Sequence, residues 1–408
     1  MATLLFLVIS IIFIGLGLPD SIFNAAWPSI SDNLGLLDTD AIYVFVCVAL
    51  GTILSSLVAT KLVGKFGTAL VSAITTVFMA IILIGFSAID SLLFFCLLSI
   101  PLGFGAGLID TTLTRYATAK YSPSRLTYLH CFYSLGASIS PILMFATLTT
   151  SNDWRNGYQL VALIMAIVAV ITLITVPFMN KASKQADENT WNIALSITLQ
   201  KEPIVFTPGE LIKIPAVRTA CLLFFLTTGI EFTCGLWGST YLVQVLNLSA
   251  TDAAGFLAFY YVGITAGRYF SARVTIVTPA QKMVYIALAF FAIAFLLFFL
   301  PTMPFFDGAA LFFIGFGNGP IYSNIMSLTP TNFGNNLFGS MSTAQTLFSN
   351  LGMLLMPLLF AFITTWFGFE AFPIFLAILY VALFIVTIVY GARTKLLRLQ
   401  LKHEEPLY

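Results

Sequence analysis

Two versions of one glycine-rich segment decide the fold of this chain: GFGAGLIDTTL (Gly103–Leu113) and GFGNGPIYSNI (Gly315–Ile325), which begin 212 residues apart. A second segment, FYSLGASISP (Phe132–Pro141), matches FSNLGMLLMP (Phe348–Pro357) in its Phe, Leu-Gly and Pro. A third match pairs Gly51 and Lys61 with Gly263 and Arg273. Because the matches keep one order and nearly one spacing, they predict two similar halves that run in the same direction.

The composition around these segments is that of a membrane protein. Of the 408 residues, 59% are hydrophobic and only 9% are charged, and the mean hydropathy is +0.98. Soluble domains carry about 25% charged residues, so lipid must be the solvent for most of this chain. The net charge of +1 offers nothing to a nucleic-acid partner.

Apolar runs of about 20 residues, the length that crosses a bilayer, predict an all-α membrane fold with twelve spans in two six-helix bundles. The predicted domains are an N-terminal bundle (1–180), a cytoplasmic linker (181–215), a C-terminal bundle (216–392) and a cytoplasmic tail (393–408). The predicted spans lie near 3–27, 41–60, 68–89, 92–118, 128–150, 157–179, 216–244, 253–273, 281–301, 306–328, 337–364 and 369–391.

The charged residues between these spans predict the orientation. Lysines and arginines gather in alternate loops and in the tail, for example at Lys61, Lys65 and Arg273, whereas the other loops hold Arg155 and mostly acids. Cytoplasmic loops of membrane proteins carry this excess of basic residues. We therefore expect both termini to be cytoplasmic.

The sequence offers no pattern for a metal, a cofactor or an enzyme. The cysteines lie in apolar runs and no zinc-type spacing occurs. His130 has no acidic or cysteine-rich constellation in its own span, so no nucleophile–base pair is evident. We expect no cofactor, no metal site and no enzymatic activity. A passive channel is disfavoured, because channels usually use oligomeric rings of filter loops. We also expect a monomer.

Ionisable residues inside the spans are the first candidates for function, because each costs about 2.5–3.5 kcal/mol on insertion scales. Asp20, Asp110, Glu231 and Arg268 lie at membrane depth, and Arg115 lies nearer a span end. Burial disfavours the charged form of a carboxylic acid and so suits it to take and release protons. Asp110, Asp20 and Glu231 are therefore candidates for proton coupling. The alternative is a buried ion pair, such as Glu231 with Arg268, that only joins two helices.

Polar and aromatic side chains in the same spans are candidates for solute binding, since amides and hydroxyls can bond a hydroxylated solute and ring faces can cover its apolar side. The alternative is that they join helices to one another. The candidates for substrate binding are Asn24, Thr114, Trp237, Tyr261, Arg268, Asn318, Gln345 and Asn350.

Over essentially its whole length the chain resembles the major facilitator superfamily, and more narrowly the fucose permease-like sugar:cation symporters. In that group a glycine-rich run, an acid, an Asn four residues later and a Tyr precede a Gly-Pro ending; Asp110, Thr114, Tyr116, Gly136 and Pro141 take these places. The resemblance implies that Asp110 is the acid of the fourth span that handles sugar and protons. It also implies that spans one, four, seven and ten line a central cavity.

Three departures from the pattern bear on the substrate. Thr114 replaces the usual Asn, and Asp20 stands one helical turn before Asn24, the place of the first-span acid. The superfamily's loop signature is reduced to KLVGKFG (Lys61–Gly67), without its acid.

The predicted function is secondary active transport by alternating access in the cell membrane. The leading hypothesis is import of a monosaccharide or similar small polar solute, coupled to protons or to sodium ions. The alternative is a proton-driven exporter of amphipathic compounds or drugs, a class that the 40 Phe residues favour somewhat.

Overall fold

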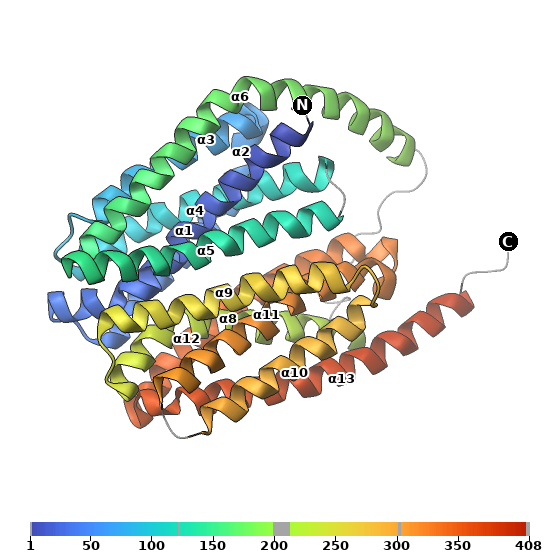
Figure 1. Ribbon diagram of the computed structural model, residues 1–408. Helices are drawn as coiled ribbons and strands as arrows, with labels where there is room; N and C mark the ends of the chain where they lie inside the picture. The colour runs from blue at the N-terminus through green and yellow to red at the C-terminus, as the bar shows by residue number, and fades with distance from the viewer. Residues whose placement is uncertain (1, 121–122, 199–212, 301–302, 405–408) are drawn as a thin grey trace.

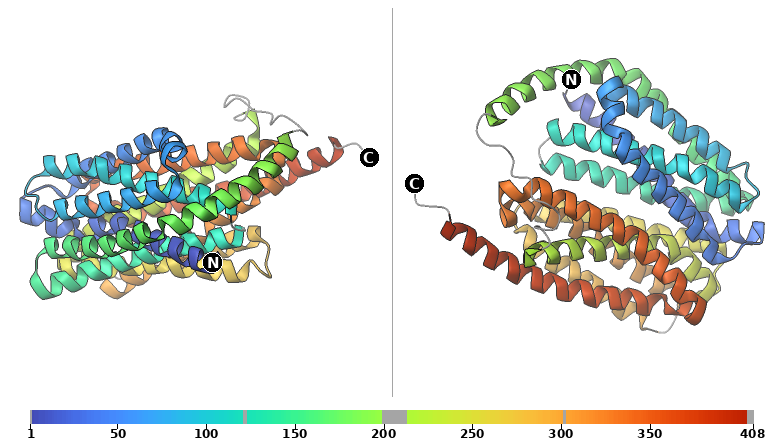
Figure 2. Two further views of the ribbon diagram at one scale, coloured as in Figure 1. Left: turned by 90° about the horizontal axis from the view of Figure 1, so that it is seen from above. Right: turned by 180° about the vertical axis from the view of Figure 1, so that it is seen from behind.

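A computed structural model describes residues 2–120, 123–198, 213–300 and 303–404, and every regular element in these ranges is helical. Two bundles lie side by side, one from each half of the chain (Figures 1 and 2). The first contains α1 (Ala2–Leu34), α2 (Ala41–Phe66), α3 (Thr68–Phe86), α4 (Leu92–Lys120), α5 (Pro123–Ser151) and α6 (Trp154–Thr198). The second contains α8 (Pro215–Leu246), α9 (Ala250–Val274), α10 (Ala280–Phe298), α11 (Pro304–Phe333), α12 (Asn335–Phe367) and α13 (Phe372–Glu404). The predicted two-bundle helical fold is confirmed.

The helices cover the predicted spans, and two of them extend far beyond their predicted ends. α6 continues as helix to Thr198, through the first part of the predicted linker 181–215, and α13 continues through most of the predicted tail 393–408. Residues 199–212 and 405–408 lie outside the described residues. Both extensions project at the end of the molecule where the two chain ends lie (Figures 1 and 2). We call this end the terminal face and the other end the opposite face.

Ten of the described helices are long and apolar enough to cross a membrane. α9 and α11 fall outside that group because glycines and polar side chains lower their hydropathy. Both nevertheless lie among the other helices of the second bundle (Figure 1). The number of twelve spans therefore remains a prediction.

Close helix contacts at glycines show that the two halves repeat one another in space. A β-carbon on Gly103 of α4 would lie 2.0 Å from the carbonyl oxygen of Val48 on α2. On the repeat-equivalent helices, a β-carbon on Gly315 of α11 would lie 2.1 Å from the carbonyl oxygen of Tyr260 on α9. Only glycine permits backbones to approach so closely. The same equivalence holds for Gly51 against Ile100 and Gly263 against Phe312.

A second pair of helix contacts repeats in the same way. A β-carbon on Gly136 of α5 would lie 2.0 Å from the carbonyl oxygen of Ile14 on α1, and one on Gly352 of α12 would lie 2.0 Å from that of Phe225 on α8. Each half is thus assembled from the same two glycine-tightened helix pairs. The internal repeat seen in the sequence is confirmed by this packing.

The two halves meet mainly along α5 and α9, which lie side by side through the middle of the molecule (Figure 1). α1 also meets α8. Toward the opposite face, Gln244 Nε2 on α8 donates to Asp38 Oδ2 at 2.6 Å, and the ring of Phe45 on α2 lies 6.1 Å from that of Phe232 on α8. Asp38 follows α1 in a short 3-10 helix (Asp38–Asp40). The halves are therefore also joined near the opposite face.

Candidate functional site

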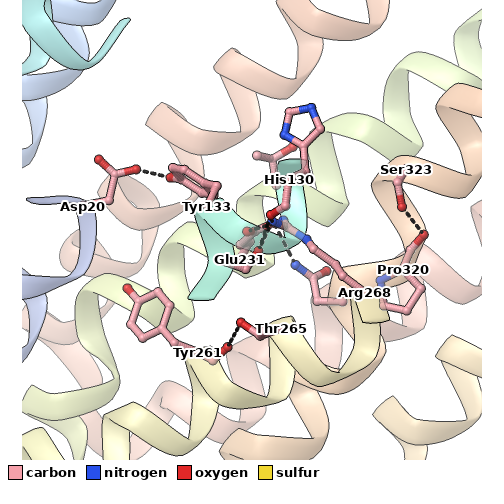
Figure 3. A network of polar contacts seen from close by, with 12 residues as sticks. Asp20, His130, Tyr133, Glu231, Tyr261, Thr265, Arg268, Pro320 and Ser323 are labelled. Atoms are coloured by element: carbon pink, nitrogen blue, oxygen red, sulfur yellow. Dashed lines mark hydrogen bonds and ion pairs between the residues drawn. The ribbon is translucent and has the colours of Figure 1, made fainter. Parts of the chain in front are cut away.

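An ion pair links two helices of the second half at the centre of the molecule. Arg268 on α9 lies 3.2 Å from Glu231 Oε1 on α8, and Asn318 on α11 donates to Glu231 Oε2, also at 3.2 Å (Figure 3). The side chains of Arg268 and Glu231 are only 14% and 21% exposed. The pairing of Glu231 with Arg268 considered from the sequence is confirmed, and an amide is added to it.

Glycine positions the guanidinium of this pair. A β-carbon on Gly319 of α11 would lie 3.2 Å from Cγ of Arg268 and 2.6 Å from the carbonyl oxygen of Ile264, one turn earlier on α9. Because Gly319 has no side chain, α9 approaches α11 and the stem of Arg268 lies over it. The glycine-rich segment of α11 thus allows close packing with α9 and orients the Arg268 guanidinium toward Glu231.

Arg268 also reaches the first half of the chain. Its guanidinium donates to Ser134 Oγ and, at 3.5 Å, to the carbonyl oxygen of His130, both on α5. Nearer the opposite face, the hydroxyls of Ser138 on α5 and Thr265 on α9 are 2.9 Å apart. These four side chains, Ser134, Ser138, Thr265 and Arg268, form what we call the α5–α9 seam.

The first half places an acid close to this network. Tyr133 on α5 donates its phenol hydroxyl to Asp20 Oδ2 on α1 (Figure 3). Gly17 lies three residues before Asp20, on the same face of α1, and a β-carbon there would lie 2.0 Å from the carbonyl oxygen of Tyr133. The glycine brings the two backbones together, and the phenol then reaches the carboxylate.

Two further candidates join the halves near Asp20. Asn24 Nδ2 donates to the Tyr261 hydroxyl at 2.9 Å, so that an amide of α1 meets a phenol of α9. Ser239 on α8 donates to the carbonyl oxygen of Asn24. Asp20, Asn24, Glu231, Tyr261, Arg268 and Asn318 are thereby gathered into one polar region between the bundles.

Asp110 lies apart from this region, toward the terminal face of α4. It accepts a hydrogen bond from Thr114 Oγ1 at 3.3 Å and is exposed. At about 100° per residue, it lies on the face of α4 opposite to Phe94 and Leu97, whose exposed side chains belong to the outer surface. Asp110 also interacts electrostatically with Tyr322, its repeat-equivalent on α11. Asp110 therefore lies away from the outer surface that Phe94 and Leu97 belong to.

Four of the predicted substrate-binding residues lie outside the polar region. Thr114 lies beside Asp110. Trp237 is fully buried and its indole nitrogen donates to the carbonyl oxygen of Pro357 at 3.1 Å. Gln345 is fully buried, and its amide nitrogen lies 3.0 Å from the hydroxyl of Thr329 on α11. Asn350 is exposed on α12. In this conformation Trp237 and Gln345 join helices within the second half.

Sequence reasoning missed Tyr133 and Ser134. Both belong to the segment FYSLGASISP, in which the repeat singles out the glycine and the proline. A tyrosine and a serine in an apolar span are common, and nothing in the segment indicates that Tyr133 faces Asp20 and Ser134 faces Arg268.

The arrangement can bind a polar molecule and move protons. The part of the chain that the structure describes contains no group of three or more His, Cys, Asp or Glu side chains that could hold a metal ion. The polar region between the two bundles contains acids, the guanidinium of Arg268, amides and phenols. The amide oxygen of Asn318 is buried and has no hydrogen-bond partner among the described residues.

Comparison with known proteins places this geometry in a family. A family model described as Major Facilitator Superfamily matches residues 5–357. Among curated proteins, Bypass of stop codon protein 6 from Saccharomyces cerevisiae (strain ATCC 204508 / S288c) is 23% identical over 280 residues, which is 63% of this chain and 54% of that protein. The chain thus spans about half the length of this relative.

Solved structures share the fold over nearly their whole length. A mutant of the nucleoside transporter NupG has a TM-score of 0.66 at 13% identity and covers 95% of this chain and 99% of its own. A bacterial homolog of the human lysosomal transporter Spinster, inward-facing and occupied, gives 0.61 at 13%, covering 97% and 96%. FucP in the outward conformation gives 0.60 at 16%, covering 94% and 98%. At these identities the likeness concerns the fold alone.

Proposed function

Because the chain belongs to the Major Facilitator Superfamily and is a transporter with multiple membrane-spanning helices, we propose that it imports a monosaccharide or similar small polar solute. Import is coupled to protons, or to sodium ions, and proceeds by alternating access between the two bundles. The observation that carries the proposal is the polar region between the halves, which holds Asp20, Asn24, Glu231, Tyr261 and Asn318 at membrane depth.

The chemistry of this region suits a solute with several hydroxyl groups. Asn24 and Tyr261 present an amide and a phenol where α1 meets α9. The free oxygen of Asn318 can accept a hydrogen bond, and a buried acceptor without a donor costs about 1–3 kcal/mol. A solute hydroxyl that donates to this oxygen would relieve that cost. Thr114, Trp237, Gln345 and Asn350 remain candidates for other stages of the transport cycle.

The acids support coupling to protons, and their surroundings assign them different parts. Glu231 is paired with Arg268 and Asp20 accepts from Tyr133, whereas Asp110 is exposed. An acid that water reaches can exchange its proton with that side of the membrane. Asp110 is therefore the main coupling residue of the proposal, and Asp20 and Glu231 are its supporting acids.

The proposed orientation has the terminal face and both termini in the cytoplasm of a cell with this protein in its plasma or inner membrane. Basic residues at the helix ends of that face, such as Lys61, Lys65 and Lys282, support it through the positive-inside bias. The contacts between the halves near the opposite face support an inward-facing conformation. The protein works as a monomer, since one chain supplies all the residues of the polar region.

Uptake into proteoliposomes tests the proposal. A panel of labelled sugars and amphipathic cationic dyes is offered with and without an imposed proton or sodium gradient. We expect a sugar to accumulate with the gradient, and Asp110→Asn to abolish accumulation while solute exchange without a gradient persists. Asp32→Asn, at an exposed position in the last turn of α1, is the matched control and should accumulate solute normally.

Two outcomes would contradict the proposal. Gradient-driven extrusion of dyes with no sugar uptake would establish the exporter of amphipathic compounds instead. Wild-type accumulation by Asp110→Asn would remove the coupling role from Asp110 and leave Asp20 and Glu231 as the acids to test.

A further inference from the structure

We propose that Tyr133 is a positioning residue that keeps Asp20 ionised and oriented, and so sets the pH range over which Asp20 exchanges its proton. This inference rests on the proposed function, because it concerns one of the acids assigned to coupling there. Within the part of the chain that the structure describes, the hydrogen bond from Tyr133 is the one that reaches the Asp20 carboxylate.

The contact is built into the first half and is not a chance meeting of two side chains. α1 and α5 touch at two glycines: a β-carbon on Gly17 would strike the carbonyl oxygen of Tyr133, and one on Gly136 would strike that of Ile14, each at 2.0 Å. Helices clamped in this way move together. The phenol therefore stays on Asp20 when the bundles rock against each other.

The neighbouring residue of α5 behaves differently. Ser134 accepts from Arg268, which belongs to the other half. A rocking motion that separates the halves at this level breaks the contact between Ser134 and Arg268 and leaves that between Tyr133 and Asp20 intact. Two consecutive residues of α5 thus have distinct parts: Ser134 joins the halves, and Tyr133 holds an acid within its own half.

Other ionisable groups surround Asp20, and each bears on its titration. Asp110 on α4 and Glu231 on α8 are acids that interact electrostatically with Asp20. Tyr261 on α9 is a second phenol whose hydroxyl accepts from Asn24. Arg268, paired with Glu231, supplies the cation of this region. A hydrogen bond donated to a carboxylate favours its ionised form, and Tyr133 supplies that donor to Asp20.

Infrared spectroscopy of the purified full-length protein tests this without knowledge of the solute. The carbonyl band of protonated Asp20 is identified as the band that Asp20→Asn removes, and its midpoint is measured against pH. In Tyr133→Phe the ring remains but the donor is lost, so Asp20 should become protonated at a higher pH, by about one to two pH units. Tyr158→Phe, which removes a buried hydroxyl of α6 that has no partner among the described residues, should leave the midpoint unchanged.

A second variant keeps the test decisive if Tyr133→Phe does not fold. Fluorotyrosine at position 133 is nearly the same size and donates a stronger hydrogen bond, so the midpoint should move to a lower pH. An unchanged Asp20 band in both variants would overturn the inference. That result is distinct from failure of the proposed transport function, which shows as the absence of gradient-driven sugar uptake in the wild-type protein.

Discussion

The repeat predicts two equivalent seams between the halves, α5 against α9 and α12 against α2, but the structure treats them differently. The α5–α9 seam is packed and carries hydrogen bonds from Arg268 to Ser134 and between Ser138 and Thr265. At the position of α12 that matches Ser134, Asn350 is exposed, and α12 touches α2 only slightly. Repeated backbone packing therefore does not make the interfaces alike.

A single residue accounts for much of the difference. The first-half counterpart of Arg268, at the spacing of 212 residues, is Ser56, which carries no charge. Arg268 supplies donors that span α8, α9 and α5 at once. One cation thus makes the α5–α9 seam the interface that is held by hydrogen bonds. We expect α2 and α12 to separate first when the halves move.

The two halves are built alike if equivalent glycines are equally important for packing. Substitution of these glycines should have the largest effect on stability. A β-carbon at Gly51 or Gly263 would lie 2.0 Å from the carbonyl oxygen of Ile100 or 2.2 Å from that of Phe312. Gly51→Ala and Gly263→Ala should each lower the free energy of unfolding by about 3 kcal/mol, because the helices must move apart. Thermal unfolding in detergent measures both.

Gly64→Ala is the matched control, because a β-carbon at Gly64 of α2 meets nothing within 4 Å. It should be neutral or stabilise the protein by up to about 1 kcal/mol, since alanine favours helix more than glycine does. If Gly263→Ala unfolds the protein and Gly51→Ala does not, the halves are not equivalent, and the difference between the seams begins inside the bundles.

Removing the cation of the α5–α9 seam should have the next largest effect. Arg268→Met leaves Glu231 in a partly buried site without its partner, and we expect a loss of about 2 kcal/mol, below the value for a fully buried pair because both side chains retain some exposure. The double variant Glu231→Gln/Arg268→Met should recover most of this stability. A thermal unfolding series of the three proteins measures the recovery.

The same variants distinguish an effect on stability from an effect on the contact between α5 and α9. A disulfide between Ser138→Cys and Thr265→Cys reports how closely α5 and α9 stay together, and its rate of formation should fall in both Arg268 variants. Arg155→Met, which breaks ion pairs with Asp90 and Asp153 at the opposite face, should change stability by less than about 1 kcal/mol. If Glu231→Gln/Arg268→Met is as unstable as Arg268→Met alone, stability depends on the Arg268 cation itself and not on its pairing with Glu231.

The sequence predicts the helices well because hydropathy and glycine spacing are local. α2, α3 and α4 begin at Ala41, Thr68 and Leu92, where the apolar runs begin. α6 runs beyond its predicted end because the polar segment KASKQADEN marks the limit of an apolar span and not that of a helix. Its Lys, Ala, Gln and Glu residues favour helix in water as well.

The site is predicted only in part, because contacts between helices depend on how each helix is rotated. Charge at membrane depth identifies Asp20, Glu231 and Arg268, and the pairing of the last two is confirmed. The partners Tyr133 and Ser134 carry no charge, and no sequence pattern states that α1 turns Asp20 toward α5. Gln345, chosen for its amide, instead bonds Thr329 within the second half.

The smallest expected effects come from the equivalent polar residues of the two seams. Ser134 is buried and accepts from a guanidinium, so Ser134→Ala should cost about 1 kcal/mol. Asn350 is exposed, so Asn350→Ala should change stability by less than about 0.5 kcal/mol. Thermal unfolding compares the stability of the two variants. The rate of disulfide formation between positions 138 and 265 compares how closely α5 and α9 stay together.

The readouts should then diverge in a way that a general loss of packing does not produce. Ser134→Ala should slow the α5–α9 disulfide and lower stability, because the tie between Arg268 and α5 is weakened. Asn350→Ala should leave both unchanged and, if Asn350 contacts solute as proposed, raise the KM for uptake instead. Equal losses of stability in the two variants would show that α12 meets α2 as firmly as α5 meets α9, and that the asymmetry belongs to one conformation of the transport cycle and not to the sequence.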